Sequence, residues 1–155
     1  MRRNLCIALV AALFITGAFA QKPNFSGTWK LNVDKSEFGP LPGYISRTDM
    51  IEHSDPKLKV TINSETQQGK QEATSNYTTD GKEATNKMGS QDVKSTVTWQ
   101  GNNLVMNAKT SFPDGDITIN SVWSLAEDGK TLTQTVHLTA PTGEADRKLV
   151  FEKQN

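Results

Sequence analysis

Cysteine is almost absent from this chain. The only cysteine of the 155-residue sequence is Cys6, which lies in an N-terminal segment that we expect to be removed. Without it, the remaining chain can form no disulfide, thiolate metal site or cysteine nucleophile. Exported eukaryotic domains of this size often carry disulfides, so the absence favours a bacterial protein of the periplasm or the medium.

Histidine is nearly as scarce, with His53 and His137 the only two in the sequence. We expect His137 on the solvated face of a strand, and His53 immediately before a turn at residues 54–56. The sequence contains no G-x-S-x-G elbow, H-E-x-x-H pair, phosphate-binding loop or calcium loop. We therefore predict no enzymatic activity, no metal site and no cofactor.

Neither sign of charge dominates. Without Arg2 and Arg3 the chain has 15 basic and 17 acidic residues, a net charge of −2. A nucleic-acid-binding domain is expected to show a basic face, and no run of like charge supplies one here. We predict no nucleic-acid partner and no attraction to an anionic membrane surface.

Long apolar runs are limited to one, near the N-terminus. Arg2 and Arg3 precede an apolar stretch over residues 5–14, and Ala18-Phe19-Ala20 forms a small-x-small cleavage site. This arrangement is typical of a secretory signal peptide, and the run is too short to span a bilayer, which needs roughly 20 apolar residues. We predict a signal peptide at residues 1–20, cleavage after Ala20, a single mature domain at residues 21–155, and a periplasmic or secreted location.

The mature chain shows alternation of apolar and polar residues at period two. Leu58, Val60 and Ile62 alternate with lysine, threonine and asparagine, and the same pattern recurs around residues 25–31, 93–99, 104–108, 117–125, 132–138 and 147–151. Such alternation predicts strands that are buried on one face and solvated on the other. Turn signals separate the strands: Asp80-Gly81, Gly101-Asn102, Asp114-Gly115, Asp128-Gly129 and Pro141-Thr142-Gly143.

These strands predict an all-β fold, a closed antiparallel up-and-down barrel of about 8–10 strands. No segment has a helical period, and the irregular residues 33–43 contain Gly39-Pro40-Leu41-Pro42-Gly43. With no helix to cover the apolar face, closure of the sheet on itself hides that face and removes the edges. A two-sheet sandwich is the main alternative. A membrane-inserted barrel is disfavoured because one face of each strand is rich in lysine and threonine.

The two ends of the mature chain resemble the calycin superfamily. The run Phe25-Ser26-Gly27-Thr28-Trp29-Lys30-Leu31-Asn32 is similar to the first strand of lipocalins and fatty-acid-binding proteins. Together with residues 33–40 it looks like the start of small secreted bacterial lipocalin-like proteins. The stretches 128–132 and 149–153 are similar to the final two strands of the same group.

The resemblance implies roles for particular residues. Gly27 and Trp29 would close one end of the barrel, and Arg147 would lie over the Trp29 ring as an arginine does in lipocalins. One family feature is missing: where fatty-acid-binding proteins carry an Arg-x-Tyr carboxylate clamp, this chain has Leu149 and Phe151. The helical lid of those proteins is also not expected.

The function that follows is an exported lipocalin-like binding protein for a small, mostly apolar ligand held inside the barrel. The candidate ligand-binding residues are Tyr77, Trp99, Met106, Trp123, Arg147 and Phe151, with Arg147 as the polar anchor. Hydroxyl and amide groups expected inside, at Ser95, Thr110, Ser121 and Gln134, favour a cavity because buried polar groups need partners. The alternative is a ligand-free barrel that acts through its outer surface as an envelope interaction or inhibitor module.

Overall fold

The computed structural model describes residues 21–155, so the predicted signal peptide lies outside the described residues. Residues 21–155 form ten strands and, within this range, no helix. Their bounds are β1 Gly27–Leu31, β2 Ser46–Ser54, β3 Lys57–Thr66, β4 Gly69–Thr78, β5 Ala84–Met88, β6 Gln91–Gln100, β7 Asn103–Phe112, β8 Gly115–Leu125, β9 Thr131–Ala140 and β10 Gly143–Lys153. No helix in this part of the chain is long and apolar enough to cross a membrane.

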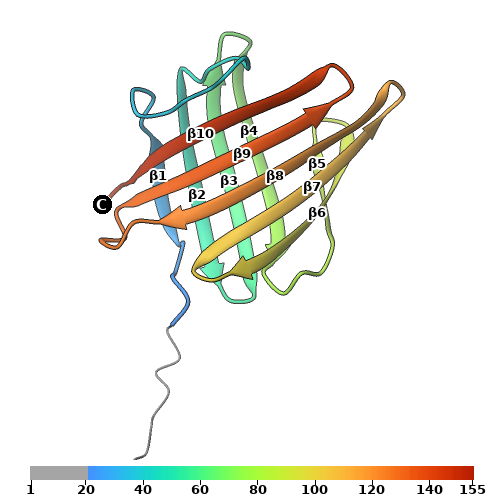
Figure 1. Ribbon diagram of the computed structural model, residues 1–155. Helices are drawn as coiled ribbons and strands as arrows, with labels where there is room; N and C mark the ends of the chain where they lie inside the picture. The colour runs from blue at the N-terminus through green and yellow to red at the C-terminus, as the bar shows by residue number, and fades with distance from the viewer. Residues whose placement is uncertain (1–20) are drawn as a thin grey trace, which may run out of the picture.

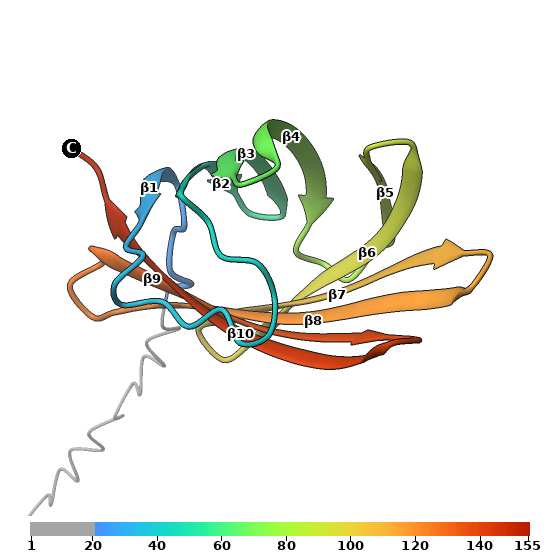
Figure 2. The same cartoon turned by 90° about the horizontal axis from the view of Figure 1, so that it is seen from above.

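The strands form one antiparallel sheet with the order β4-β3-β2-β1-β10-β9-β8-β7-β6-β5. Nearly every strand pairs with its neighbours in sequence, and β1 also pairs with β10, so the first and last strands are adjacent. The sheet curls around its apolar face until β4 and β5 approach each other (Figures 1 and 2). The prediction of an all-β up-and-down antiparallel barrel is confirmed.

Closure is incomplete at one junction, between β4 and β5, which are the two ends of the sheet. The short strand β5 covers only residues 84–88, whereas β4 covers residues 69–78. The first part of β4, residues 69–74, is exposed on both faces and carries no large apolar side chain. With nothing to bury there, the two end strands gain little by forming a ladder, and the barrel is nearly closed rather than fully closed.

Side chains alternate across the sheet as the sequence predicts. On β3, Leu58 and Val60 are buried, and on β6 and β7 the same holds for Val97 and Leu104. The polar interior expected from the sequence is also present, because Ser95, Thr110, Ser121 and Gln134 are all buried. The interior of the barrel therefore combines an apolar core with buried polar groups.

Phe25 and Trp29 fill one end of the barrel, and both side chains are fully buried. The Trp29 indole Nε1 donates a hydrogen bond of 2.9 Å to the carbonyl oxygen of Phe25, which ties the segment before β1 across this end. The Phe25 ring lies 6.0 Å from that of Trp99 and 6.5 Å from that of Trp123. We call this end the closed end.

The cation over Trp29 is Lys153, whose Nζ lies 5.3 Å from the ring centroid. The expectation that Arg147 occupies this position is wrong. The β1–β10 register sets Trp29 opposite Lys153, and Arg147 lies six residues earlier on β10. At about 3.3 Å per residue, that places Arg147 roughly 20 Å further along the strand, toward the opposite end of the barrel.

Candidate functional site

The barrel contains a cavity of about 350 Å³ on the side away from the closed end. Every strand residue that lines it faces inward, and the loop before β2 contributes Leu41 and Tyr44. The apolar part of the lining comprises Leu41, Val60, Ile62, Met106, Ile119, Trp123, Val136, Leu138 and Leu149. The polar part comprises Tyr44, Arg47, Ser75, Tyr77, Ser121, Gln134 and Arg147. This composition, mostly apolar with a few convergent polar groups, is typical of small-molecule sites.

Two arginines meet at Tyr44 in the polar part of the wall. The Tyr44 hydroxyl accepts hydrogen bonds from Arg47 Nη1 at 3.1 Å and from Arg147 Nη1 at 3.3 Å. Both guanidinium groups also lie over the Tyr44 ring, 5.2 Å and 5.5 Å from its centroid. Arg147 comes from β10 and Arg47 from β2, so Tyr44 joins two separate strands through the loop.

Arg47 is neutralised by a neighbour. Its Nε and Nη2 donate to Asp49 Oδ1 and Oδ2 at 2.7 Å and 2.8 Å, and Asp49 is fully buried. Burial alone would lower the pKa of Arg47, but the charge of Asp49 and its hydrogen bonds outweigh burial and raise that pKa. Gln134 Nε2 donates a further hydrogen bond of 3.3 Å to Asp49 Oδ2.

Arg147 has no such carboxylate. Among the ion pairs formed within residues 21–155, none involves Arg147. Its Nη2 donates to the carbonyl oxygen of Pro42 at 3.2 Å, and its buried Nε has no hydrogen-bond partner in the described structure. The wall of the cavity therefore carries one guanidinium without a counter-ion and one unused buried donor.

Two aromatic residues line the cavity beside this polar region. The Trp123 indole Nε1 donates to Ser121 Oγ at 2.9 Å. Burial raises the pKa of the Tyr77 hydroxyl, so this phenol stays neutral at physiological pH. Both side chains present an apolar ring and a polar atom inside the barrel.

Of the six residues predicted to contact a ligand, Tyr77, Met106, Trp123 and Arg147 line the cavity. Trp99 and Phe151 do not, so their expected place in the cavity wall is corrected. Trp99 lies at the closed end against Phe25. Phe151 is fully buried and packs beneath the Arg47 guanidinium, whose Cζ lies 5.4 Å from the centroid of the Phe151 ring. Gly27 and Trp29 lie on β1, outside the cavity lining.

The sequence pattern does not reveal Tyr44, Arg47 and Asp49 as residues of this site. The strand that carries Arg47 and Asp49 alternates strictly, with residues 47, 49, 51 and 53 facing inward, but three of these four are polar or charged. A spacing of two between an arginine and an aspartate on a strand is the one signal that could have revealed the pair. Tyr44 lies in the loop and has no periodic signal.

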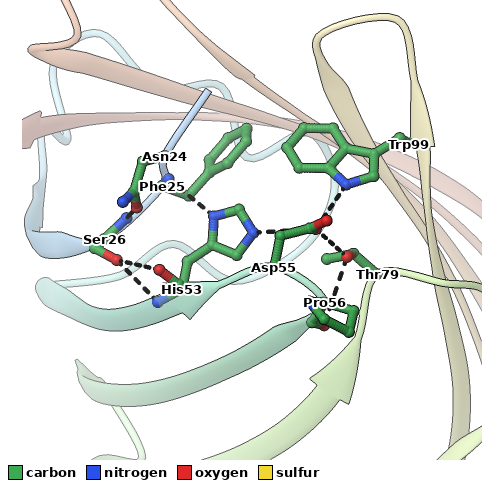
Figure 3. Close-up of polar contacts among 8 residues, drawn as sticks. All are labelled: Asn24, Phe25, Ser26, His53, Asp55, Pro56, Thr79 and Trp99. Atoms are coloured by element: carbon green, nitrogen blue, oxygen red, sulfur yellow. Dashed lines mark hydrogen bonds and ion pairs between the residues drawn. The ribbon is translucent and has the colours of Figure 1, made fainter. Parts of the chain in front are cut away.

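A second polar cluster lies at the closed end (Figure 3). The backbone N–H of Phe25 donates to His53 Nδ1 at 3.2 Å, so the hydrogen of the neutral imidazole is on Nε2. His53 Nε2 faces Asp55 Oδ1 at 3.7 Å, which exceeds hydrogen-bond length. Asp55 Oδ1 in turn accepts hydrogen bonds from Thr79 Oγ1 and, at 2.9 Å, from Trp99 Nε1.

The electrostatics of this cluster favour neutral His53 and ionised Asp55. Burial lowers the pKa of His53, against the opposing effect of Asp55. The hydrogen bonds from Thr79 and Trp99 lower the pKa of Asp55. Ser26 Oγ donates to the carbonyl oxygen of His53 at 2.9 Å rather than to its ring, so the cluster offers no activated nucleophile. The arrangement fastens the segment before β1 to the turn after β2.

No protein-family model matches this chain, and no curated protein sequence is significantly similar to it. Similar solved structures do exist. A secretory abundant heat soluble protein of Ramazzottius varieornatus is 17% identical, with a TM-score of 0.62 over 83% of this chain and 94% of that one. The zebrafish ileal bile-acid-binding protein, in complex with cholic acid, is 16% identical, with a TM-score of 0.57 over 84% of this chain and 98% of that one.

A fatty-acid-binding protein of Echinococcus granulosus is 17% identical, with a TM-score of 0.55 over 84% of this chain and 98% of that one. At these identities the likeness concerns the fold. The ten-stranded antiparallel barrel of this chain matches each of these structures along nearly its whole length. The chain therefore has the fold of the calycin β-barrels.

Proposed function

We propose that this chain is an exported binding protein that holds one small, mostly apolar molecule with a single acidic group inside its barrel. The observation that carries the proposal is Arg147, a guanidinium in the polar part of the cavity wall that has no carboxylate partner and has a buried, unused Nε. A buried donor without a partner is costly, and an anionic oxygen supplied by a ligand would satisfy it.

The charge of the cavity wall supports a single negative charge on the ligand. Arg47 and Asp49 neutralise each other, and Arg147 remains. A second anionic group would be desolvated without compensation, which is strongly unfavourable in an apolar cavity. Neutral Tyr77 and the hydroxyl of Ser75 can add hydrogen bonds without changing this balance.

The size of the cavity, about 350 Å³, suits a compact hydrophobic molecule. The zebrafish neighbour was determined with cholic acid, and the Echinococcus neighbour is named for fatty acids.

This chain lacks the Arg-x-Tyr clamp on its last strand, so the polar contact in our proposal is built differently, from Arg147 and Tyr44. We propose binding without catalysis, in the periplasm or outside the cell, after removal of residues 1–20.

Two fluorescent probes with the same ring system test the proposal. 1-Anilinonaphthalene-8-sulfonate carries one sulfonate, and N-phenyl-1-naphthylamine is the same skeleton without it. Arg147→Leu should weaken binding of the sulfonate probe by about 10- to 100-fold, the range expected for a lost charge-assisted hydrogen bond, and should change the neutral probe about twofold or less.

Lys148→Leu is the matched control, because Lys148 is exposed on the same strand and faces outward. It should leave both affinities unchanged. Equal weakening by the two variants, or binding of neither probe by the wild-type protein, would contradict the proposal and favour a ligand-free barrel.

A further inference from the structure

The first part of β4 is a sheet edge without a partner. β4 is the last strand of the sheet, and β3 pairs with its other side in one-to-one register, from Gly69 opposite Thr66 to Thr78 opposite Lys57. In Figure 1 the β3–β4 hairpin rises above the end of β5, and Figure 2 shows β4 and β5 standing apart. Residues 69–74 are exposed on both faces, so this edge is accessible to a further strand.

The backbone groups that point to this edge are identified by Asn76. The Asn86 side chain binds both the N–H and the carbonyl oxygen of Asn76, at 2.8 Å and 3.0 Å, from the side away from β3. Because such groups alternate along a strand, those of Lys70, Glu72 and Thr74 point the same way. In the described part of the chain, no strand pairs with this side of the three residues. Their donors and acceptors are therefore available to an extended chain.

This edge lacks the features that usually prevent strand edges from pairing. Sheet edges are commonly protected by proline, by a bulge, by a charged side chain on the inner face or by lysines. Residues 69–74 contain no proline, their register with β3 has no bulge, and their one lysine is balanced by one glutamate. Repulsion between like charges therefore does not keep a second copy of the edge away.

Charge selects one register for two antiparallel copies of this edge. Residues whose backbone groups face the partner strand stand opposite one another. Lys70 opposite Lys70, or Glu72 opposite Glu72, brings like charges together, which is destabilising. Lys70 opposite Glu72 of the second copy brings opposite charges together on both sides of a two-fold axis through Gln71. The next register places Lys70 opposite Asn76, whose backbone groups Asn86 already occupies.

The row of charges continues onto β3. Glu65 stands opposite Lys70 in the β3–β4 register, and Asn63 stands opposite Glu72. In the paired arrangement Lys70 therefore lies between two carboxylates, Glu65 of its own chain and Glu72 of the second copy. Each exposed ion pair contributes little and the paired segment is short, so we expect a weak and reversible contact with a dissociation constant of about 0.1–1 mM.

We infer that this protein associates with a second copy of itself by antiparallel pairing of the two β4 edges, with Lys70 of each copy opposite Glu72 of the other. The interface is then a continuous sheet in the order β3-β4-β4-β3, with Gln71 of both copies on the two-fold axis. The paired segment ends before Ser75 and Tyr77, which line the cavity, so each barrel keeps its own cavity wall. The inference is independent of ligand binding.

A cysteine on the two-fold axis tests the register. The chain beyond residue 20 contains no cysteine, so Gln71→Cys introduces a single thiol. The two Cα atoms of this pair would lie about 4.5 Å apart, within the span of roughly 4.4–6.8 Å that a disulfide bridges. Ala73→Cys is the matched control on the same face of the same strand, but its two Cα atoms would lie more than about 13 Å apart.

With diamide as the oxidant and at equal protein concentration, Gln71→Cys should form a disulfide-linked dimer at least about tenfold faster than Ala73→Cys, because pairing holds its thiols together. Equal rates for the two variants would show random collision and would overturn the inference. Faster cross-linking of Ala73→Cys would overturn the register that the charges select.

Charge reversal tests the partner. Lys70→Glu and Glu72→Lys each place like charges opposite one another, and each should weaken self-association at least about tenfold in sedimentation equilibrium. An equimolar mixture of the two variants again pairs opposite charges and should associate as the wild type does. Lys57→Glu is the matched control, because Lys57 is exposed at the far end of β3 and makes the same change in net charge. It should leave the dissociation constant unchanged.

A wild-type protein that stays monomeric at about 1 mM would overturn the inference. Equal weakening by Lys57→Glu and Lys70→Glu would also overturn it, because general repulsion would then explain both. Association restored by the mixture cannot come from misfolding of either variant, so it supports the pairing directly. These measurements need no bound probe, so their failure leaves the proposed function standing, and failure of probe binding leaves the pairing standing.

Discussion

Arg47 and Asp49 lie two residues apart on the inward face of β2 and form a two-point ion pair inside the barrel, with distances of 2.7 Å and 2.8 Å. The Asp49 side chain is fully buried, and Gln134 on β9 binds the same carboxylate. The pair is therefore a structural element of the barrel, and it removes one of the two positive charges from the cavity wall.

Asp49→Ala should be strongly destabilising, because it leaves the Arg47 guanidinium buried without compensation. Breaking a buried ion pair by removing one partner costs about 3–5 kcal/mol. Urea denaturation should show this loss in the free energy of unfolding. The double variant Arg47→Met/Asp49→Leu should recover most of it, since an apolar pair leaves no buried charge. A double variant as unstable as Asp49→Ala would contradict this account.

His53 should make the stability of the protein depend on pH. Burial lowers the pKa of His53 from its usual 6.5, so the unfolded chain binds a proton more readily than the folded one. The stabilisation is fully present above pH 6.5 and is lost as the pH falls below that value, levelling off below the folded-state pKa. Urea midpoints measured from about pH 8 to pH 5 should therefore decrease with acidity.

The matched variants for this prediction are His53→Asn and His137→Asn. His53→Asn keeps an acceptor for the Phe25 N–H but does not titrate, so the decrease should become smaller. His137 behaves in the opposite sense: Asp146 raises its pKa, and the stability it contributes is lost as the pH rises. Because His137 is exposed, its variant should change the profile only slightly. A decrease that is unaffected by His53→Asn would rule out His53 as its cause.

The sequence predicts those strands well whose inward residues are apolar. Leu58, Val60 and Ile62 alternate with polar residues, and the structure places all three inside. The same alternation does not reveal β2, because the inward positions hold Arg47, Asp49 and His53, while Met50 faces outward and is 41% exposed. Specific partners, which no local pattern shows, make these polar residues stable inside.

Alternation also shows which side a residue faces but not its height in the barrel. Trp99, Trp123 and Phe151 are all inward residues in the sequence pattern, yet only Trp123 lines the cavity. Height depends on the register between strands, which sets Trp29 opposite Lys153 and Trp123 opposite Leu104. For the same reason the sequence could not show that Arg147 meets Tyr44 instead of Trp29.

Phe25 should be one of the main stabilising residues of the closed end. Its ring is fully buried between His53, Trp99 and Trp123, and its backbone binds both His53 and Trp29. Replacing a buried phenylalanine by alanine costs about 3–5 kcal/mol, so Phe25→Ala should lower the free energy of unfolding by that amount. Val33→Ala, at a 37% exposed position, is the control and should cost well under 1 kcal/mol.

The cavity itself should be unaffected by that change, because Phe25 does not line it. Under conditions where Phe25→Ala remains folded, its affinity for 1-anilinonaphthalene-8-sulfonate should stay within about threefold of the wild type. A much larger loss of affinity at unchanged fold would show that the closed end is part of the binding site.

Trp123 should report binding in the cavity, because it is the one tryptophan of three that lines it. A bound 1-anilinonaphthalene-8-sulfonate molecule would lie against the Trp123 indole and quench its fluorescence most strongly by energy transfer. Trp123→Phe should therefore remove the largest part of the quenching seen on titration, whereas Trp99→Phe should remove less. Phenylalanine keeps the ring that packs against the probe, so the affinity of Trp123→Phe should change little. Quenching that is equally strong in Trp123→Phe would mean that the probe binds elsewhere on the barrel.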